Sequence, residues 1–223
     1  GLIALGLIYV VYLYHVWNYP PDQEYSDAVF VMQNFGRRPW AVFRVGRICG
    51  EVHAQLHEVR APGIIPSLKD TLKRRIETSG PLPQRLAEFA LAALDGLPDG
   101  EALCHGDFHP GNILLAGETP VLIDWTNAMR GDPAADVART RLMLRLGEAP
   151  PGTSFALRAL ARVGRSLLVT LYLRSYRRAR PLDMSAVKRW EIPVAAARLA
   201  EGIEEEAPRL LALLERAAGG SAG

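Results

Sequence analysis

The sequence predicts a mainly α-helical protein with one small β-hairpin, an α+β fold. Apolar residues recur at helical spacing over most of residues 40–218. Two short apolar runs, 113–115 and 121–123, are separated by a turn-forming stretch, which indicates a hairpin. The 223 residues are 49% hydrophobic and 22% charged, so the composition is that of a globular protein and excludes a disordered chain.

Charge and cysteine content exclude further classes. The net charge is only +2, so no nucleic-acid partner is expected. Cys49 and Cys104 lie in apolar surroundings without Cys-x-x-Cys spacing, so a disulfide framework is not expected. We therefore expect a cytoplasmic location, where thiols stay reduced. The chain begins with Gly rather than Met, so we expect a fragment or a processed product. The oligomeric state cannot be inferred from the sequence.

The first expected unit is 1–34, an apolar segment followed by a loop. Residues 1–21 contain no Asp, Glu, Lys or Arg, and residues 2–17 are almost all apolar. That length approaches the ~20 residues of a membrane-spanning helix, so membrane anchoring through 2–17 is one reading. The β-branched residues and tyrosines of the segment favour the other reading, one or two buried strands. Pro20 and Pro21 end the segment.

A helix is expected to begin at Pro39, with an apolar stripe that continues to Val59. His53 and His57 lie one turn apart on this helix and share a face. Such a pair can bind zinc, but the zinc motif His-Glu-x-x-His has glutamate where this chain has Ala54. Histidines packed between helices are therefore the favoured interpretation.

The later helices are predicted from apolar spacing, caps and stop signals. Ser67 is expected to cap the first of them, whose charged residues, including Arg75, should form a solvated face. The basic run 174–180 is expected to be a solvated helix end. Residues 219–223 should be a disordered tail. The expected helices are 68–76, 83–94, 134–146, 154–178, 185–201 and 203–218.

Residues 103–125 concentrate polar side chains between apolar runs. The stretch reads Leu-Cys-His-Gly-Asp-Phe-His-Pro-Gly-Asn-Ile-Leu-Leu, a short turn, and then Pro-Val-Leu-Ile-Asp-Trp. Residues 102–104 should be extended, and 105–112 should form a loop that enters the hairpin. Asp124 is then expected where the second strand ends. A polar loop held by strands suits catalytic residues.

The spacing of this stretch matches phosphoryl-transfer chemistry. His105, Gly106 and Asp107 are followed by four residues and then Asn112, and kinases have the catalytic loop H-R-D-x-x-x-x-N. Asp124 stands where kinases have the aspartate of D-F-G. Asp107 is therefore the predicted base for the substrate hydroxyl. Asn112 and Asp124 are the predicted ligands of Mg²⁺, which prefers oxygen.

These residues, together with Gly131-Asp-Pro-Ala-Ala-Asp136, resemble the aminoglycoside phosphotransferase family, which includes other small-molecule kinases. The resemblance covers about 35–218 and implies a protein-kinase-like C-terminal, helical lobe. It implies transfer of the γ-phosphoryl group of ATP or GTP to a hydroxyl of a small molecule. It also implies that His105 and Asp136 support the catalytic loop and that His109 contacts substrate or phosphates.

The family's N-terminal lobe carries a phosphate-covering loop and a nucleotide-binding lysine, and neither is found here. The first lysine is Lys69, and only 34 residues precede Phe35. We therefore expect that lobe to be largely missing. Residues 1–34 would then be a vestige of it, a frameshifted stretch or a membrane helix.

Two alternative functions remain open. Without that lobe, the chain could be a catalytically silent kinase remnant that serves as a binding module. His105, Asp107 and His109 alternate along the chain and could instead ligate zinc in a metallohydrolase, with His53 and His57 as further ligands. Acidic residues that would suit a cationic aminosugar are few in the helical part, and they are Glu148, Asp183, Glu191 and 204–206.

Overall fold

The computed structural model describes residues 41–116, 119–146 and 155–220. The apolar segment 2–17, and with it the choice between buried strand and membrane helix, lies outside the described residues. Within these three ranges, no helix is both long enough and apolar enough to cross a membrane. The helix that ends the described part continues to Gly220, so it includes the first two residues of the expected tail.

The mainly helical fold with a small hairpin is confirmed. The described helices are α3 (Ala41–Leu56), α4 (Leu68–Glu77), α5 (Gln84–Asp95), α6 (Pro133–Leu146), α7 (Phe155–Ala179), α8 (Met184–Arg198) and α9 (Ala207–Gly220). The strands are β1 (Ala102–Cys104), β2 (Ile113–Ala116), β3 (Thr119–Leu122) and β4 (Met129–Gly131). Short 3-10 turns lie at η1 (Pro110–Asn112), η2 (Trp125–Asn127) and η3 (Leu199–Glu201).

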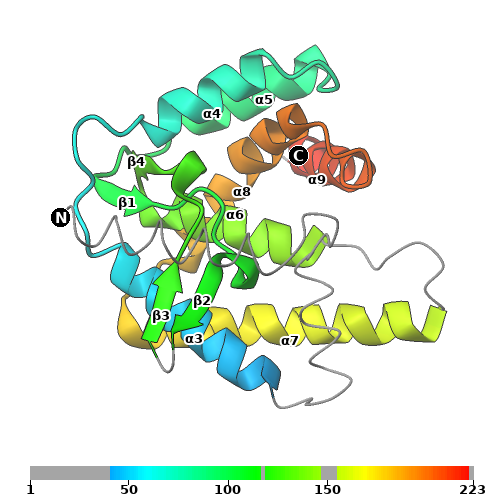
Figure 1. The fold of residues 1–223 in the computed structure, drawn as a ribbon. Coiled ribbons are helices and arrows are strands. Elements are labelled where there is room, and N and C mark those ends of the chain that lie inside the picture. The colour runs from blue at the N-terminus through cyan, green and yellow to red at the C-terminus, as the bar shows by residue number, and fades with distance from the viewer. Residues whose placement is uncertain (1–40, 117–118, 147–154, 221–223) are drawn as a thin grey trace, which may run out of the picture.

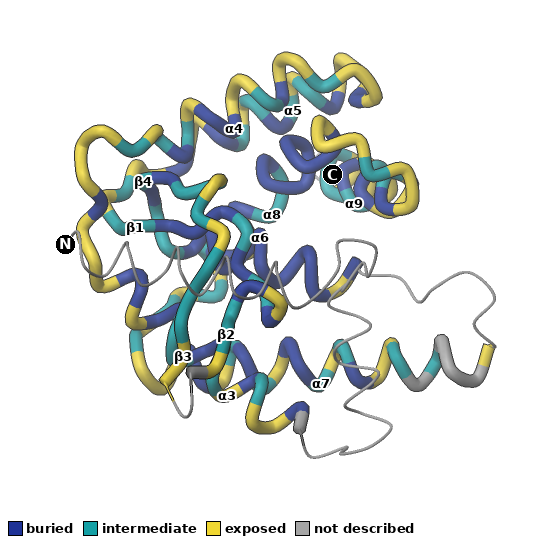
Figure 2. Tube along the Cα trace, in the orientation of Figure 1, coloured by how far each residue is buried: buried dark blue, intermediate teal, exposed yellow. Residues whose placement is uncertain are grey.

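The helices surround α6, which lies near the centre of the body (Figure 1). Helices α3 and α7 pack together on one side of it, and α4 and α5 lie on the other side with α8 between. Figure 2 shows α6 almost wholly buried, whereas the outer faces of α4 and α5 are exposed. A central helix that is covered on all sides provides a rigid support for the residues at its start.

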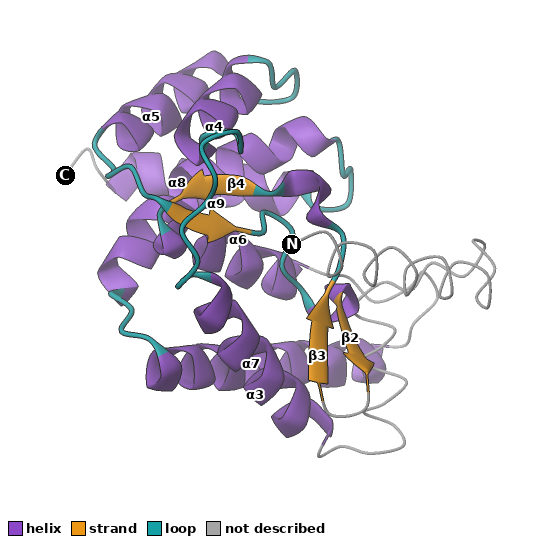
Figure 3. Cartoon of the chain, turned by 60° about the vertical axis from the view of Figure 1, so that its left-hand side comes forward, coloured by secondary structure: helices purple, strands orange, loops and turns teal. Residues whose placement is uncertain are grey.

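The two strand pairs lie at different places (Figure 3). The predicted hairpin is β2–β3, with Ile113 opposite Leu122, and it projects from the helical body. The second pair, β1–β4, was not predicted, because β4 has only three residues, too few for a sequence pattern to indicate a strand. Ala102 faces Gly131 in this pair. Since β1 leads into the loop 105–112 and β4 leads into α6, the pairing places the loop beside the first turn of α6.

Helices α3 and α7 approach each other closely at Gly50. A Cβ atom at this position would lie 2.5 Å from the backbone oxygen of Tyr172 and 2.5 Å from the Cβ of Ser175. Only glycine allows this contact without displacing the backbone. The close packing brings the buried face of α3 against the side chains of α7.

The C-terminal helices differ from the prediction at their junction. Helix α8 ends at Arg198 and is followed by η3, and α9 begins only at Ala207. Gly202, at the end of η3, has a φ of +72°, in the left-handed region that favours glycine. This turn breaks the helical periodicity and places η3 beside α4 and α8.

Candidate active site

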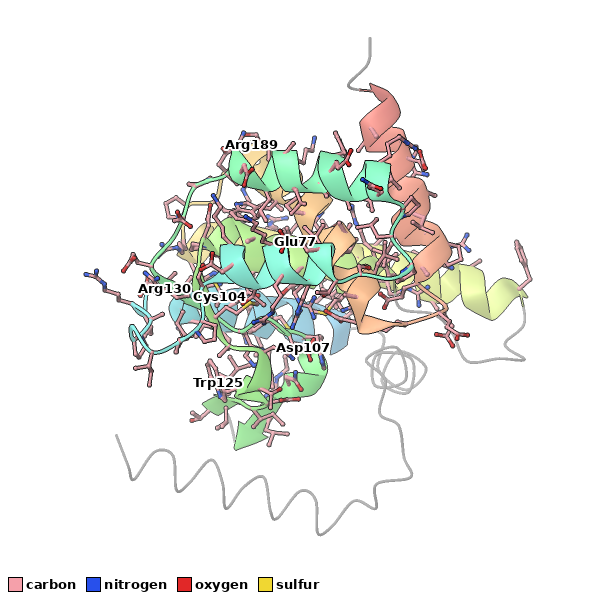
Figure 4. The ribbon with its side chains drawn as sticks, turned by 90° about the horizontal axis from the view of Figure 1, so that it is seen from above. Glu77, Cys104, Asp107, Trp125, Arg130 and Arg189 are labelled. Carbon is pink, nitrogen blue, oxygen red and sulfur yellow. The ribbon has the colours of Figure 1, made fainter. Side chains whose placement is uncertain are left out.

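The polar loop begins directly after β1 and is anchored by buried residues on both sides of Asp107. His105 and Phe108 are fully buried, while Asp107 itself is 25% exposed. Gly106 has a φ of +76°, and a Cβ there would lie 2.1 Å from the backbone oxygen of Asn127. The loop therefore requires glycine at this position, where kinases have arginine. Figure 4 shows Asp107 and Trp125 on the side of the body that carries the hairpin.

His105 connects the loop to the strand that leads to Asp124. Its Nε2 lies 2.9 Å from the backbone oxygen of Ile123, and its Nδ1 lies 3.2 Å from the backbone nitrogen of Asp107. These partners assign the tautomer, because Nε2–H must donate to the carbonyl while Nδ1 accepts from the amide. The ring also packs against Trp125, with 5.0 Å between ring centroids.

The Asp136 carboxylate, on the first turn of α6, accepts hydrogen bonds from the loop backbone. The amide nitrogen of His105 lies 2.6 Å from one oxygen, and that of Gly106 lies 3.0 Å from the other. Burial opposes ionisation of this carboxylate. Hydrogen bonds from His53 and His57 outweigh that effect and hold the pKa of Asp136 well below its ordinary value. An ionised carboxylate therefore fixes the two residues that precede Asp107.

Asp107 is held in its ionised form. Partial burial would raise its pKa, but the hydrogen bond and charge of His109, followed by the charges of Arg139 and His105, lower it. His109 Nε2 lies 3.6 Å from Asp107 Oδ2, and Arg139 Nη2 lies 3.9 Å from Oδ1. An ionised, partly exposed carboxylate can accept a proton from a hydroxyl placed against it.

Asn112 and Asp124 are linked through the backbone. The Asn112 side-chain nitrogen donates to the backbone oxygen of Asp107 at 2.9 Å, which leaves its amide oxygen as an acceptor. The backbone oxygen of Asn112 accepts from Ile123 at 2.9 Å, immediately before Asp124. Asp124 is exposed and adopts a left-handed conformation (φ 59°, ψ 69°), which is uncommon outside glycine and typical of strained functional sites. Thr126 Oγ1 donates to its carboxylate at 2.7 Å.

Sequence reasoning missed an arginine cluster next to the loop. Arg139, on α6, donates from Nε to the backbone oxygen of Gly106 and lies 2.7 Å from Glu201. Arg75 lies 3.2 Å from the same glutamate and donates to Asn127 at 3.1 Å. The prediction that Arg75 belongs to a solvated face is wrong, since its side chain is only 24% exposed. No local signal sets Arg139 apart, because α6 carries two further arginines, Arg141 and Arg145.

The acidic residues considered for a cationic substrate are mostly engaged elsewhere. Glu191 pairs with Arg141, and Glu206 makes two hydrogen bonds with Arg198. Asp183 caps α8 by accepting from Ser185 at 2.8 Å. Glu148 lies outside the described residues. Glu201, which was not among them, shares Arg139 with Asp107, and its charge is balanced by Arg139 and Arg75.

The zinc-hydrolase arrangement is not formed. His105, Asp107 and His109 lie in a loop rather than along one strand, and both ring nitrogens of His105 are hydrogen-bonded to the chain. His109 Nδ1 accepts from Gly111 at 3.1 Å and caps η1. His53 and His57 lie with Asp136, where all three side chains are fully buried. These two histidines pack between helices, as the sequence interpretation favoured.

Burial of His53 predicts sensitivity to acid. Burial, followed by the charge of His57, lowers the pKa of His53 from 6.5 to about 3. The unfolded chain therefore takes up a proton at His53 below pH 6.5 that the folded chain does not, so the free energy of unfolding should decrease as the pH falls from 6.5 to about 3. Urea denaturation across this range measures the slope, and His53→Gln should flatten it. An equal pH dependence of the free energy of unfolding in the unaltered chain and in His53→Gln would contradict the lowered pKa of His53.

Comparison with known proteins gives a family and a fold. The sequence model of the phosphotransferase enzyme family (APH) matches residues 16–182. No protein in a curated collection matches the chain. A glucosamine kinase structure (crystal form B) aligns with a TM-score of 0.50 and 19% identity, covering 92% of this chain and 60% of that one. At this identity the alignment shows a shared fold, and the kinase-like fold expected from the sequence is confirmed.

Two further glucosamine kinase structures are similar. Crystal form A gives a TM-score of 0.47 at 17% identity, over 85% of this chain and 57% of that one. The complex of glucosamine kinase with glucosamine, ADP and inorganic phosphate gives a TM-score of 0.48 at 18% identity, and the alignment covers 92% of this chain and 59% of that one. The chain thus spans 57–60% of the length of the three structures.

Proposed function

The chain belongs to the phosphotransferase enzyme family, and on that premise we propose that it transfers the γ-phosphoryl group of ATP or GTP to a hydroxyl of a small molecule. The observation that carries the proposal is the position of Asp107. Its ionised carboxylate is partly exposed, while the backbone just before it is hydrogen-bonded to the buried Asp136. Phosphoryl transfer depends mainly on positioning of the reactants and on stabilisation of charge. A carboxylate that is fixed in place can position the acceptor hydroxyl.

In this proposal Asp107 orients the acceptor hydroxyl and accepts its proton. The neighbouring Arg139 and His109 keep the carboxylate ionised, so it is ready to accept at neutral pH. The attacking oxygen then bonds to the γ-phosphorus as the bond to the leaving nucleoside diphosphate breaks. His105 and Asp136 support the loop in this step and do not touch the reacting atoms. His109 lies at the exposed edge, where it would contact substrate or phosphates.

Asn112 and Asp124 fit a magnesium site. A carboxylate and an amide oxygen are ligands that Mg²⁺ accepts, with water and phosphate oxygens completing its shell. The hydrogen bond from Asn112 Nδ2 to Asp107 turns the amide nitrogen toward the loop and leaves the oxygen as the ligand atom. When bound, Mg²⁺ neutralises charge on the nucleotide phosphates. The strained backbone of Asp124 is consistent with a residue kept for a ligand.

The domain division is part of the proposal. Residues 35–218 are assigned to the C-terminal lobe of a kinase-like fold, with 1–34 as a separate segment and 219–223 as a tail whose first two residues continue α9. Lys69, the first lysine of the chain, donates from Nζ to the backbone oxygen of Leu97 at 2.6 Å. It is therefore not assigned to the nucleotide.

Addition of Mg²⁺ and ATP should raise the melting temperature if Asp124 and Asn112 hold the metal–nucleotide complex. Saturation at ~100 times the dissociation constant corresponds to about 2.7 kcal/mol of added stability. Asp124→Ala should remove the rise, whereas Asp95→Ala, at an exposed position at the end of α5, should retain it. A rise of equal size in Asp124→Ala would contradict the ligand assignment.

Acceptors can be found with a panel of hydroxyl compounds that contains neutral sugars, aminosugars such as glucosamine, and amino alcohols. Transfer from ATP or GTP is followed as nucleoside diphosphate release and as mass gain of the acceptor. Transfer to any member supports the proposal. Absence of both transfer and nucleotide-dependent stabilisation would favour the alternative, a silent kinase-like binding module.

A further inference from the structure

Two buried histidines remain without a role in the proposed chemistry. His53 is fully buried and His57 is 2% exposed. His53 lies in the last turn of α3 and His57 directly after its end, on the same side as Gly46 and Gly50, and this side packs against α7. Buried imidazoles require partners, because an unpaired buried polar group destabilises the fold.

Each histidine has a tyrosine partner on α7. His53 Nδ1 lies 2.8 Å from the Tyr172 hydroxyl, and His57 Nδ1 lies 2.7 Å from the Tyr176 hydroxyl. Both pairs are separated by 119 residues, so the two helices run in the same direction and the pairs lie one turn apart. Burial raises the pKa of both tyrosines above the ordinary value, which keeps the hydroxyl protons in place.

The other ring nitrogens converge on one oxygen atom. His53 Nε2 lies 3.1 Å, and His57 Nε2 lies 3.3 Å, from Oδ2 of Asp136. An ionised carboxylate can only accept, so the N–H of each ring points to Asp136 and Nδ1 accepts from the tyrosine. Two chains of hydrogen bonds, tyrosine to histidine to aspartate, therefore end at the carboxylate that holds His105 and Gly106.

We propose that His53 and His57, each oriented by a tyrosine hydroxyl of α7, are positioning residues for Asp107. This rests on the proposed phosphoryl transfer. They fix the direction of the Asp136 carboxylate, and that carboxylate fixes the backbone immediately before Asp107. Small displacements of a catalytic group cost large factors in rate, so this support acts on turnover rather than on substrate binding.

The same three side chains offer a second interpretation, a buried metal ion. Their ligand atoms lie within 4.8 Å of one another. A metal would take the lone pairs of both Nε2 atoms, whereas the proposal places protons there. Metal analysis of the purified chain therefore separates the two interpretations.

Variants at His57 test whether its hydrogen bond to Asp136 supports turnover. His57→Gln keeps an N–H donor near the position of Nε2, and His57→Leu removes it. We expect kcat to fall about 10- to 100-fold in His57→Leu with little change in KM for Mg·ATP, and to be partly restored in His57→Gln. Gln55→Leu, at an exposed position of the same helix, is the matched control. Equal kcat for the leucine and glutamine variants would overturn the proposal.

A second measurement does not require activity. Hydrogen exchange of the His105 and Gly106 amides, followed by NMR, should be faster in His57→Leu and in the double variant Tyr172→Phe/Tyr176→Phe than in the unaltered chain. The tyrosine variants keep the ring packing, which guards against loss of the fold. Unchanged protection, or one equivalent of zinc retained after chelator treatment, would overturn the proposal. Faster exchange in a chain that binds no nucleotide would leave the support of the loop intact and count against the phosphotransfer function alone.

Discussion

Replacement of Asp107 by asparagine should lower the rate of phosphoryl transfer by about 10²- to 10⁴-fold, the usual contribution of a general base. Asparagine has nearly the same shape and can still lie beside Arg139, but it cannot accept the hydroxyl proton. The fall should appear in kcat. The measurement is steady-state transfer to an acceptor found in the panel, with purified protein of confirmed fold.

The control for this variant is nucleotide binding. Asp107 is not among the residues assigned to the metal, so Asp107→Asn should retain the rise in melting temperature with Mg²⁺ and ATP that Asp124→Ala loses. Turnover equal to that of the unaltered chain would remove Asp107 from the mechanism. Loss of both turnover and nucleotide stabilisation would point to damage of the whole loop.

Replacement of Asp136 by asparagine should lower the free energy of unfolding by about 3–5 kcal/mol, as removal of one partner from a buried charged network does. The carboxylate is 1% exposed and accepts from two backbone amides and two histidines. An asparagine amide would present a donor to groups that are themselves donors. Urea denaturation at neutral pH gives the difference directly.

Asp95→Asn is the matched control, because this aspartate is exposed at the last residue of α5. Its effect should lie within about 0.5 kcal/mol. Acid should weaken the contribution of Asp136 to stability. The pKa of this carboxylate is lower in the folded chain than in the unfolded chain, so its ionised form stabilises the fold above the unfolded pKa. The stabilisation is lost as the pH falls through the folded pKa. If Asp136→Asn lowered the free energy of unfolding no more than Asp95→Asn does, the network around the Asp136 carboxylate would not stabilise the fold.

The helices could be predicted because their apolar residues lie on one face and their ends carry standard signals. Ser67 caps α4 by accepting from the backbone of Asp70 at 3.3 Å, as expected from its position before an apolar run. The hairpin also follows from local pattern. In the loop, the spacing from Asp107 to Asn112 was sufficient to place the candidate residues on one segment.

The partners of these residues could not be predicted, because they depend on contacts across the chain. Arg75 resembles its exposed neighbours on α4, and only η3 packed against that helix places Glu201 beside it. Likewise, Tyr172 lies in an apolar stretch that is typical of core packing. Tyr176 lies in the basic run 174–180, and the prediction that this run is solvated is wrong for Tyr176, whose side chain is fully buried. The sequence pattern does not distinguish a tyrosine that fills space from one whose hydroxyl holds a histidine.

The separation of 119 residues between His53 and Tyr172, and between His57 and Tyr176, has a consequence for folding. The loop 105–112 lies between the two partners in sequence, so its support is complete only after the ends of this long segment meet. During synthesis on a ribosome, α3 and the loop emerge well before α7. Until then both histidines lack their tyrosines, and the loop gains its final conformation late. Contacts of such long range are also those that slow the folding of a domain.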